Sequence, residues 1–222
     1  MQSLSPTATL SNGMLLPMVG LGTYAGEDFE KLLKAAIETG YRVLDTAKVY
    51  KNEKLIGKVL QEIFKEGKIK RSDLFITTKI WNDPSLDVYE ALKESLRDLQ
   101  LDYVDLCLDH WAIGVPNADK TKMIAKPLHV IWREFERCQK DGLCKALGVS
   151  NFNCQSLMDL MSFAEIKPVV NQIEVSPYLS QVDLIAWCQK MGIHITAYSP
   201  LCRGGADVKE VFGDIVGKIN PL

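Results

Sequence analysis

The chain has 222 residues, of which 47% are hydrophobic and 24% charged, and this ordinary globular composition excludes a disordered or fibrous protein. The formal net charge is −2, so no basic excess is available to neutralise phosphates, and we expect no nucleic-acid partner. No apolar run approaches the ~18 residues of a membrane span, so we expect no membrane insertion. The first basic residue is Lys31 and the six cysteines form no Cys-x-x-Cys pair, which predicts a cytoplasmic protein with buried, reduced thiols.

Short apolar runs alternate with amphipathic segments along the chain. In chain order we expect a strand at 19–23, a helix at 29–37, a strand at 42–45, a helix at 55–63, a strand at 74–79, a helix at 88–99, a strand at 104–110, a helix at 128–140, a strand at 146–150, a helix at 156–163, a strand at 169–174, a helix at 182–191 and a strand at 194–198. Gly40, Gly142 and Gly192 stand where helix ends favour glycine. A longer connection at 111–127 is polar and shows no pattern.

Seven strands that alternate with helices indicate an α/β protein with a parallel sheet. Two architectures fit this order, a (β/α)8 TIM barrel and a doubly wound open sheet. A dinucleotide-binding open sheet carries Gly-x-Gly-x-x-Gly after its first strand, whereas Gly20-Leu21-Gly22-Thr23-Tyr24-Ala25 lacks the third glycine. The sequence therefore favours the barrel.

Active-site residues of such barrels lie at the carboxyl ends of the strands. Polar, titratable or aromatic residues stand at each of these ends, namely Gly22-Thr23-Tyr24, Asp45 with Tyr50, Lys79 with Trp81, His110 with Trp111, Ser150-Asn151, Asn171-Gln172 and Tyr198-Ser199. Any one of them alone is more often a helix cap or a turn residue. Matched residue types at successive strand ends indicate a site.

Four of these residues together suit the protonation of a carbonyl oxygen. Tyrosine has a pKa near 10 in water, but an ammonium group such as Lys79 beside Tyr50 would stabilise the phenolate. Asp45 would keep Lys79 charged and in place, and a neutral His110 would orient the carbonyl oxygen. None of these groups supplies a hydride, so the chemistry requires a cofactor, and no metal site is expected.

Several motifs resemble those of the aldo-keto reductases. Asp45-Thr46-Ala47-Lys48-Val49-Tyr50-Lys51-Asn52-Glu53, with Gly57, is similar to the signature of that family, and 10–23 resembles its N-terminal hairpin and first strand. Further motifs follow in the family's order up to residue 202, at 77–81, 108–111, 148–152, 171–174 and 197–201. The resemblance implies one (β/α)8 barrel domain over 1–222, with the hairpin at 1–18, barrel units at 19–202 and an unassigned tail at 203–222.

The resemblance also implies an oxidoreductase that reduces small aldehydes and ketones with NADPH. It gives Tyr50 the role of general acid, Lys79 and Asp45 the role of its tuning pair, and His110 the role of orienting the carbonyl group. The residues implied to bind the cofactor are Gly22, Thr23, Asp45, Ser150, Asn151, Gln172, Tyr198, Ser199 and Leu201. Those implied to line the substrate pocket are Tyr24, Trp81, His110 and Trp111.

The chain departs from the family's pattern after the seventh strand. Only 24 residues follow Tyr198, roughly half of what a helix, an eighth strand and a closing helix need, so we expect a barrel truncated after about seven strands. The family's Lys-Ser and Arg-x-x-Glu-Asn segments, which bind the adenosine 2′-phosphate, do not occur, so we expect weak selectivity for NADPH over NADH. Cys202-Arg203-Gly204-Gly205 also alters the loop that covers the pyrophosphate in the family.

An open barrel edge is a site for strand pairing, and three explanations fit it. The sequence is part of a longer protein, another chain supplies the missing part, or the chain is a degenerate member of an assembly in which a protein partner covers the edge. Two functional hypotheses follow, a carbonyl reductase and a non-catalytic structural or regulatory subunit.

One further departure is Asp109, where the family has an apolar residue. Strand alternation turns Asp109 toward the helices, where its carboxyl group needs a partner or a raised pKa.

Overall fold

The computed structural model describes residues 5–24, 28–83, 85–116 and 121–202. Its main feature is a parallel seven-stranded sheet in the order β11-β10-β9-β6-β5-β4-β3. Its strands are β3 (Gly20–Gly22), β4 (Val43–Asp45), β5 (Phe75–Ile80), β6 (Val104–Asp109), β9 (Cys144–Ser150), β10 (Val170–Glu174) and β11 (His194–Tyr198). The strands follow one another around the sheet in chain order, which is the topology of a barrel, whereas the order of a doubly wound sheet reverses.

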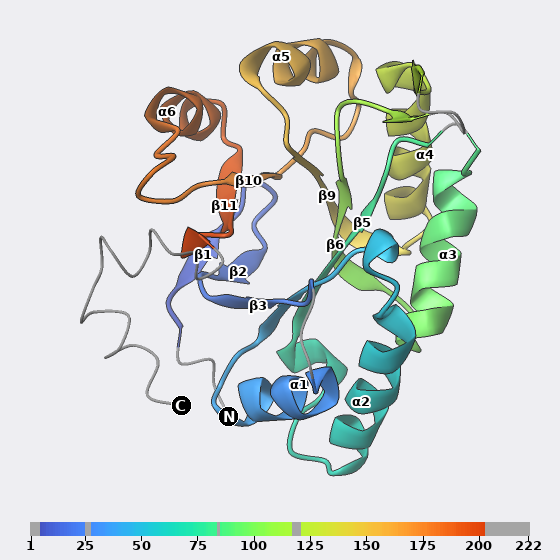
Figure 1. Cartoon of the computed structure of the whole chain (residues 1–222), viewed down its shortest axis with the longest axis vertical. Coiled ribbons are helices and arrows are strands. Elements are labelled where there is room, and N and C mark those ends of the chain that lie inside the picture. Colours follow the sequence, from blue (N-terminus) through green and yellow to red (C-terminus); the bar gives the residue numbers. More distant parts are fainter. Residues whose placement is uncertain (1–4, 25–27, 84, 117–120, 203–222) are drawn as a thin grey trace.

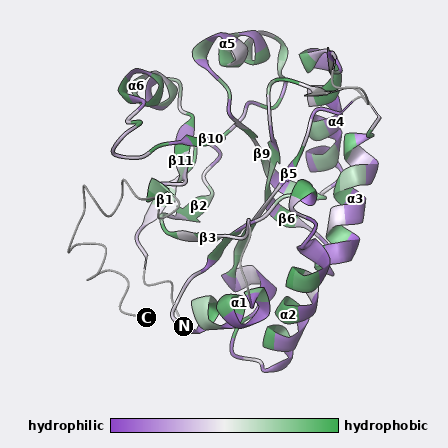
Figure 2. Cartoon of the chain, viewed as in Figure 1, coloured by the Kyte–Doolittle hydropathy of each residue, from purple (hydrophilic) through white to green (hydrophobic). Residues whose placement is uncertain are grey.

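The strands curve into a nearly closed barrel with the helices outside it (Figure 1). The helices are α1 (Phe29–Glu38), α2 (Glu53–Lys65), α3 (Val88–Leu99), α4 (Leu128–Lys140), α5 (Cys154–Phe163) and α6 (Val182–Lys190). Hydrophobic and hydrophilic residues share the surfaces of α2 and α3 (Figure 2), as amphipathic helices require. Gly40 follows α1 with φ +105°, a backbone conformation that ends the helix and that glycine adopts without strain. The fold is therefore a (β/α)8-type barrel described through its seventh strand.

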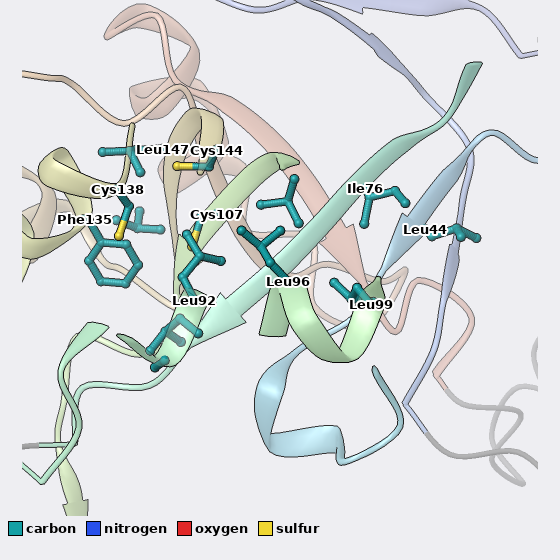
Figure 3. Close-up of a cluster of buried hydrophobic side chains, with 14 of the residues drawn as sticks. Leu44, Ile76, Leu92, Leu96, Leu99, Cys107, Phe135, Cys138, Cys144 and Leu147 are labelled. Atoms are coloured by element: carbon teal, nitrogen blue, oxygen red, sulfur yellow. The ribbon is translucent and has the colours of Figure 1, made fainter. Parts of the chain in front are cut away.

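The largest hydrophobic core lies between the sheet and the helices. Figure 3 shows Leu92, Leu96 and Leu99 of α3 in one cluster with Cys107 of β6, and all four side chains are buried. A second core cluster combines Leu10 with strand residues that include Val43, Phe75 and Val170, the first residues of β4, β5 and β10. It includes the hairpin of β1 (Thr7–Thr9) and β2 (Leu15–Pro17), which therefore packs against the amino-terminal end of the barrel, opposite the strand ends that carry the polar residues.

The six cysteines are all free thiols. Cys107, Cys138, Cys144 and Cys188 are buried, as expected from their apolar surroundings. The expectation is wrong for Cys154 and Cys202, which are only half-buried. Cys154 begins α5, where a helix end meets solvent, and an apolar sequence context does not reveal this position.

Two features differ from the elements expected from the sequence. The connection at 111–127 contains a small antiparallel pair, β7 (Val115–Pro116) and β8 (Met123–Ile124). The sequence did not predict this pair because strands of two residues leave no periodic pattern. Burial also decreases from the middle of the sheet toward the edge strand β11. Every residue of β5 and β6 is buried, whereas β11 is half-exposed. Among the described strands none pairs with the outer side of β11 or β3, and the tail at 203–222 lies outside the described residues.

Within the described ranges, no helix has the length and apolar character that crossing a membrane requires.

Candidate active site

Three neighbouring strands bring the titratable residues to one end of the barrel. Asp45 is the last residue of β4, Lys79 lies one residue before the end of β5, and His110 directly follows β6. Tyr50 ends a short 3-10 helix, η1 (Lys48–Tyr50), in the loop after β4. Because parallel strands in register end at the same edge, residues 65 positions apart in the sequence become neighbours.

The ammonium group of Lys79 is enclosed by oxygen atoms. Lys79 is only 1% exposed, and its Nζ atom forms an ion pair with Asp45. It also donates hydrogen bonds to the Thr46 carbonyl oxygen at 3.0 Å and to the Tyr50 hydroxyl oxygen at 3.3 Å. These three acceptors match the three protons of the ammonium group. Since Lys79 donates to the phenol oxygen, the hydroxyl proton of Tyr50 stays available for donation to another group.

His110 is held in its neutral form. The side chain is 8% exposed, and burial, followed by the positive charge of Lys79, lowers its pKa to about 4. Its ring lies 6.0 Å from the Tyr50 ring, centroid to centroid, at an interplanar angle of 76°. The buried Nδ1 atom has no hydrogen-bond partner among the described residues. A neutral imidazole at this position can donate one N–H to an uncharged oxygen near the Tyr50 hydroxyl.

A chain of hydrogen bonds connects the ends of β9, β10 and β11 to the Asp45 carboxylate. Tyr198 donates to Asn151 Oδ1 at 2.8 Å, and Asn151 donates to Ser150 Oγ at 3.1 Å. Ser150 Oγ donates to the Gln172 carbonyl oxygen at 2.9 Å, and Gln172 Nε2 donates to Asp45 Oδ2 at 2.6 Å. Three amide or hydroxyl side chains thus lie beside an aromatic ring, a setting that suits a planar aromatic ligand with an amide group.

The other residues assigned to the cofactor by resemblance lie at the same end of the barrel. Gly22 pairs with Asp45 in the sheet register, and the Thr23 amide donates to the Asp45 carbonyl oxygen at 2.9 Å. The Thr23 hydroxyl is buried, with no hydrogen-bond partner in the described part of the chain. Ser199 has φ +48°, which turns the chain sharply after β11, and Leu201 is exposed.

Aromatic rings extend from Tyr50 and His110 on both sides. The Tyr24 ring lies 5.0 Å from the Tyr50 ring, and the Trp81 ring lies 5.3 Å from the His110 ring. Trp111 stacks on Trp81 at 6.1 Å with an interplanar angle of 22°. The four residues expected to line a substrate pocket, Tyr24, Trp81, His110 and Trp111, therefore lie around Tyr50. Their rings provide apolar surface there.

Sequence reasoning missed the residue that anchors the long connection next to these rings. Asn82, 1% exposed, accepts from the Lys126 amide at 3.0 Å and donates to the Lys126 carbonyl oxygen at 3.2 Å. Lys126 in turn forms an ion pair with Glu134 of α4 at 2.8 Å. The position of Asn82 directly after Trp81 was a signal, but its partner lies 44 residues away in a segment without a pattern.

Asp109 is the last residue of β6, directly before His110, and strand alternation directs its side chain away from the site. The residue is fully buried, and neither carboxyl oxygen has a hydrogen-bond partner within the described residues. Burial raises the pKa of Asp109 well above its usual range, although the backbone amide of Trp111 favours the charged form. The expectation that this carboxyl group would need a partner or a raised pKa is confirmed, with the raised pKa as the outcome.

The described residues contain no group of three or more His, Cys, Asp or Glu side chains that could hold a metal ion.

Comparison with known proteins connects this geometry to one family. The model of the Aldo/keto reductase family matches residues 10–220. Aldose reductase B of Dictyostelium discoideum is 43% identical over 227 residues, covering 92% of this chain and 73% of the relative. Glyoxal reductase of Bacillus subtilis is 42% identical over 222 residues, covering 98% and 75%. The crystal structure of a Bombyx mori aldo-keto reductase in complex with NADP has a TM-score of 0.82 and 39% identity, over 90% of this chain and 67% of that one.

Proposed function

The chain belongs to the aldo/keto reductase family, and from this premise we propose that it reduces aldehydes or ketones to alcohols with NADPH, using Tyr50 as the general acid. The observation that carries the proposal is the 3.3 Å contact between Lys79 Nζ and the Tyr50 hydroxyl oxygen. Support for the cofactor comes from the Bombyx mori structure in complex with NADP and from the hydrogen-bonded side chains of Ser150 and Asn151 beside Tyr198.

The residues of this chain provide the proton and the charge stabilisation. NADPH, when bound, supplies the hydride that reaches the carbonyl carbon. Tyr50 donates its hydroxyl proton to the carbonyl oxygen, and the Lys79 ammonium stabilises the phenolate that remains. Asp45 and the Thr46 carbonyl oxygen hold the ammonium in place. Neutral His110 donates a hydrogen bond to the same carbonyl oxygen and stabilises its developing negative charge.

The polar chain from Tyr198 to Asp45 would hold the nicotinamide end of the cofactor. Ser150, Asn151 and Gln172 have hydroxyl and amide groups for the carboxamide, and the Tyr198 ring would stack on the nicotinamide ring. Gly22, Thr23, Ser199 and Leu201 would contact the rest of the cofactor. Competitive titration of the purified chain with NADPH and NADH measures its selectivity between the two cofactors.

The proposal is tested by the oxidation of NADPH with a panel of aldehydes. The purified chain should consume NADPH in the presence of aldehyde and form the corresponding alcohol. The Tyr50→Phe variant keeps the ring but removes the proton donor, so it is the matched control. Absence of turnover above this control would contradict the proposal.

A non-catalytic structural or regulatory subunit is the second candidate function. The observation that favours it is the half-exposed strand β11, together with Val182 of α6, which is 66% exposed. In such an assembly a protein partner would cover this edge of the barrel. Sedimentation of the purified chain tests this alternative, because a free, soluble monomer with reductase activity would remove its motive.

A further inference from the structure

The loop that carries Tyr50 is fastened by the two residues that begin α2. Asn52 Nδ2 donates to the Thr23 carbonyl oxygen at 2.7 Å, and Asn52 Oδ1 accepts from Thr46 Oγ1 at 3.3 Å. Asparagine at the N-cap of a helix usually accepts a hydrogen bond from that helix. Asn52 occupies the N-cap of α2 but makes no such bond. Its amide instead connects the residues that follow β3 and β4.

Glu53 fastens the same loop to β5. Its side chain is 3% exposed and accepts a hydrogen bond from Thr78 Oγ1 at 2.6 Å. Thr78 directly precedes Lys79 and, by strand alternation, points to the opposite face of the sheet. A buried carboxyl group is costly unless it is hydrogen-bonded, so this contact fixes Glu53 firmly against the strand that carries Lys79. The hydrogen bond between Glu53 and Thr78 therefore connects the segment that follows Tyr50 to the residue that precedes Lys79, on the outer face of the sheet.

Apart from buried Ala47 and the ring contacts of Tyr50 with Tyr24 and His110, the remaining features of the loop favour movement. Residues 48–50 form a single 3-10 turn, and Lys51 has φ +58°, a strained conformation for a residue other than glycine. The ion pair between Lys48 and Glu94 lies near the surface, where such pairs contribute little. Tyr50 is half-buried, and its hydroxyl has to stay near Lys79. A displacement of about 1 Å in a reacting group can cost roughly 10²-fold in rate.

We propose that Asn52 and Glu53 are positioning residues, which act through Tyr50 by holding its hydroxyl at the Lys79 ammonium. This role rests on the proposed function of Tyr50 as the general acid. According to this proposal, contacts with Thr23, Thr46 and Thr78, at the ends of three strands, determine the position of the Tyr50 hydroxyl.

The first test compares variants by kcat, KM and the Kd for NADPH. Asn52→Ala and Glu53→Ala should each lower kcat about 10- to 100-fold. Glu53→Ala should also leave the Kd for NADPH within about twofold, because Glu53 bonds to Thr78 and not to a residue of the proposed cofactor site. Glu53→Gln keeps an oxygen that can accept from Thr78 and should restore kcat to within about threefold of wild type. Glu94→Gln, which removes the exposed partner of the same loop, is the matched control and should leave kcat unchanged.

The second test does not depend on activity. Hydrogen exchange of the peptide that contains the Tyr50 and Lys51 amides, which bond to Ala47 and Lys48 carbonyl oxygens, reports on the turn directly. Exchange should be faster in Asn52→Ala and Glu53→Ala than in wild type, and unchanged in Glu94→Gln.

The outcomes separate the two proposals. An inactive wild-type chain would contradict the proposed function, and the exchange measurement would still decide whether Asn52 and Glu53 hold the turn. An active wild-type chain with unchanged kcat in both alanine variants would overturn the positioning role alone. The same holds if kcat, the Kd for NADPH and the thermal midpoint all worsen together without rescue by Glu53→Gln, since that pattern indicates general loosening of the fold.

Discussion

Lys79 donates a hydrogen bond from its buried ammonium group to the hydroxyl oxygen of Tyr50 across 3.3 Å. The direction of this bond matters as much as its length. The phenol oxygen accepts, so its own proton points elsewhere, and the positive charge is already in place for the phenolate that forms when the proton leaves. The remaining two protons of Lys79 are bound by Asp45 and by the Thr46 carbonyl oxygen, which prevents the ammonium group from turning away.

Replacing Lys79 by methionine should lower kcat by about 10² to 10⁴, because the phenolate loses its stabilising charge while the side-chain volume is kept. The Kd for NADPH should change little. Steady-state kinetics together with fluorescence titration of the cofactor measure both quantities. A Lys79→Met protein with nearly wild-type kcat would show that Tyr50 does not need the ammonium group.

The low pKa of His110 predicts how stability depends on pH. The unfolded chain binds a proton at this residue near pH 6.5, whereas the folded chain does so only near pH 4. Between these values the unfolded state binds more protons, so stability falls as the pH falls. From pH 7 to pH 5, wild type should lose roughly 2 kcal/mol more free energy of unfolding than His110→Gln. Urea denaturation at both pH values measures this difference, and equal losses would contradict the buried, neutral imidazole.

Replacing Asp109 by leucine should stabilise the fold. Because burial raises the folded-state pKa of this carboxyl group, the wild-type protein loses stability as the pH rises above the unfolded-state value near 3.8. Asp109→Leu removes a buried polar group that has no hydrogen-bond partner among the described residues, and it should raise the free energy of unfolding at pH 7 by about 1 to 3 kcal/mol. The gain should shrink toward pH 4. A gain that is independent of pH would indicate improved packing alone.

Gly57 of α2 marks the closest approach between α2 and α3. A Cβ atom there would lie 2.2 Å from the Asp98 carbonyl oxygen and 2.7 Å from that of Leu99, so the two helices would have to separate. Gly57→Ala should therefore lower the free energy of unfolding by about 1 to 3 kcal/mol, despite the better helix propensity of alanine. Lys54→Ala, on the exposed side of the same helix, is the control and should change stability by less than about 0.5 kcal/mol. Chemical denaturation distinguishes the two variants.

The sequence allowed the barrel to be predicted because its elements are regular. The apolar spacing at 88–99 and the glycines after the helices predict boundaries that agree with the structure within about two residues. Polar residues near a helix end give a wrong boundary where a tertiary contact determines the start of the helix. The helix α2 begins at Glu53, two residues before the first apolar residue of its pattern, because a carboxyl group is buried there against Thr78.

The contacts of Lys79 with Tyr50 and Asp45 in the candidate site could be predicted from the sequence, whereas other contacts around it could not. Strand ends meet at one edge of a parallel sheet, so Asp45, Lys79 and His110 could be brought together by topology alone. The hydrogen bond from Gln172 to Asp45 spans 127 residues in the sequence, and the anchoring of Lys126 by Asn82 spans 44. The first contact crosses the barrel between β10 and β4, which are not neighbours in the sheet, and the second lies between two loops, so neither leaves a periodic pattern in the sequence.

The most direct test of the account is single-turnover reduction of an aldehyde by wild type and by Tyr50→Phe, each loaded with NADPH. If the phenol donates the proton, Tyr50→Phe should bind NADPH with nearly wild-type affinity and transfer hydride about 10² to 10⁴ times more slowly. A phenylalanine variant that binds the cofactor and reduces the aldehyde at the wild-type rate would show that the proton comes from another group.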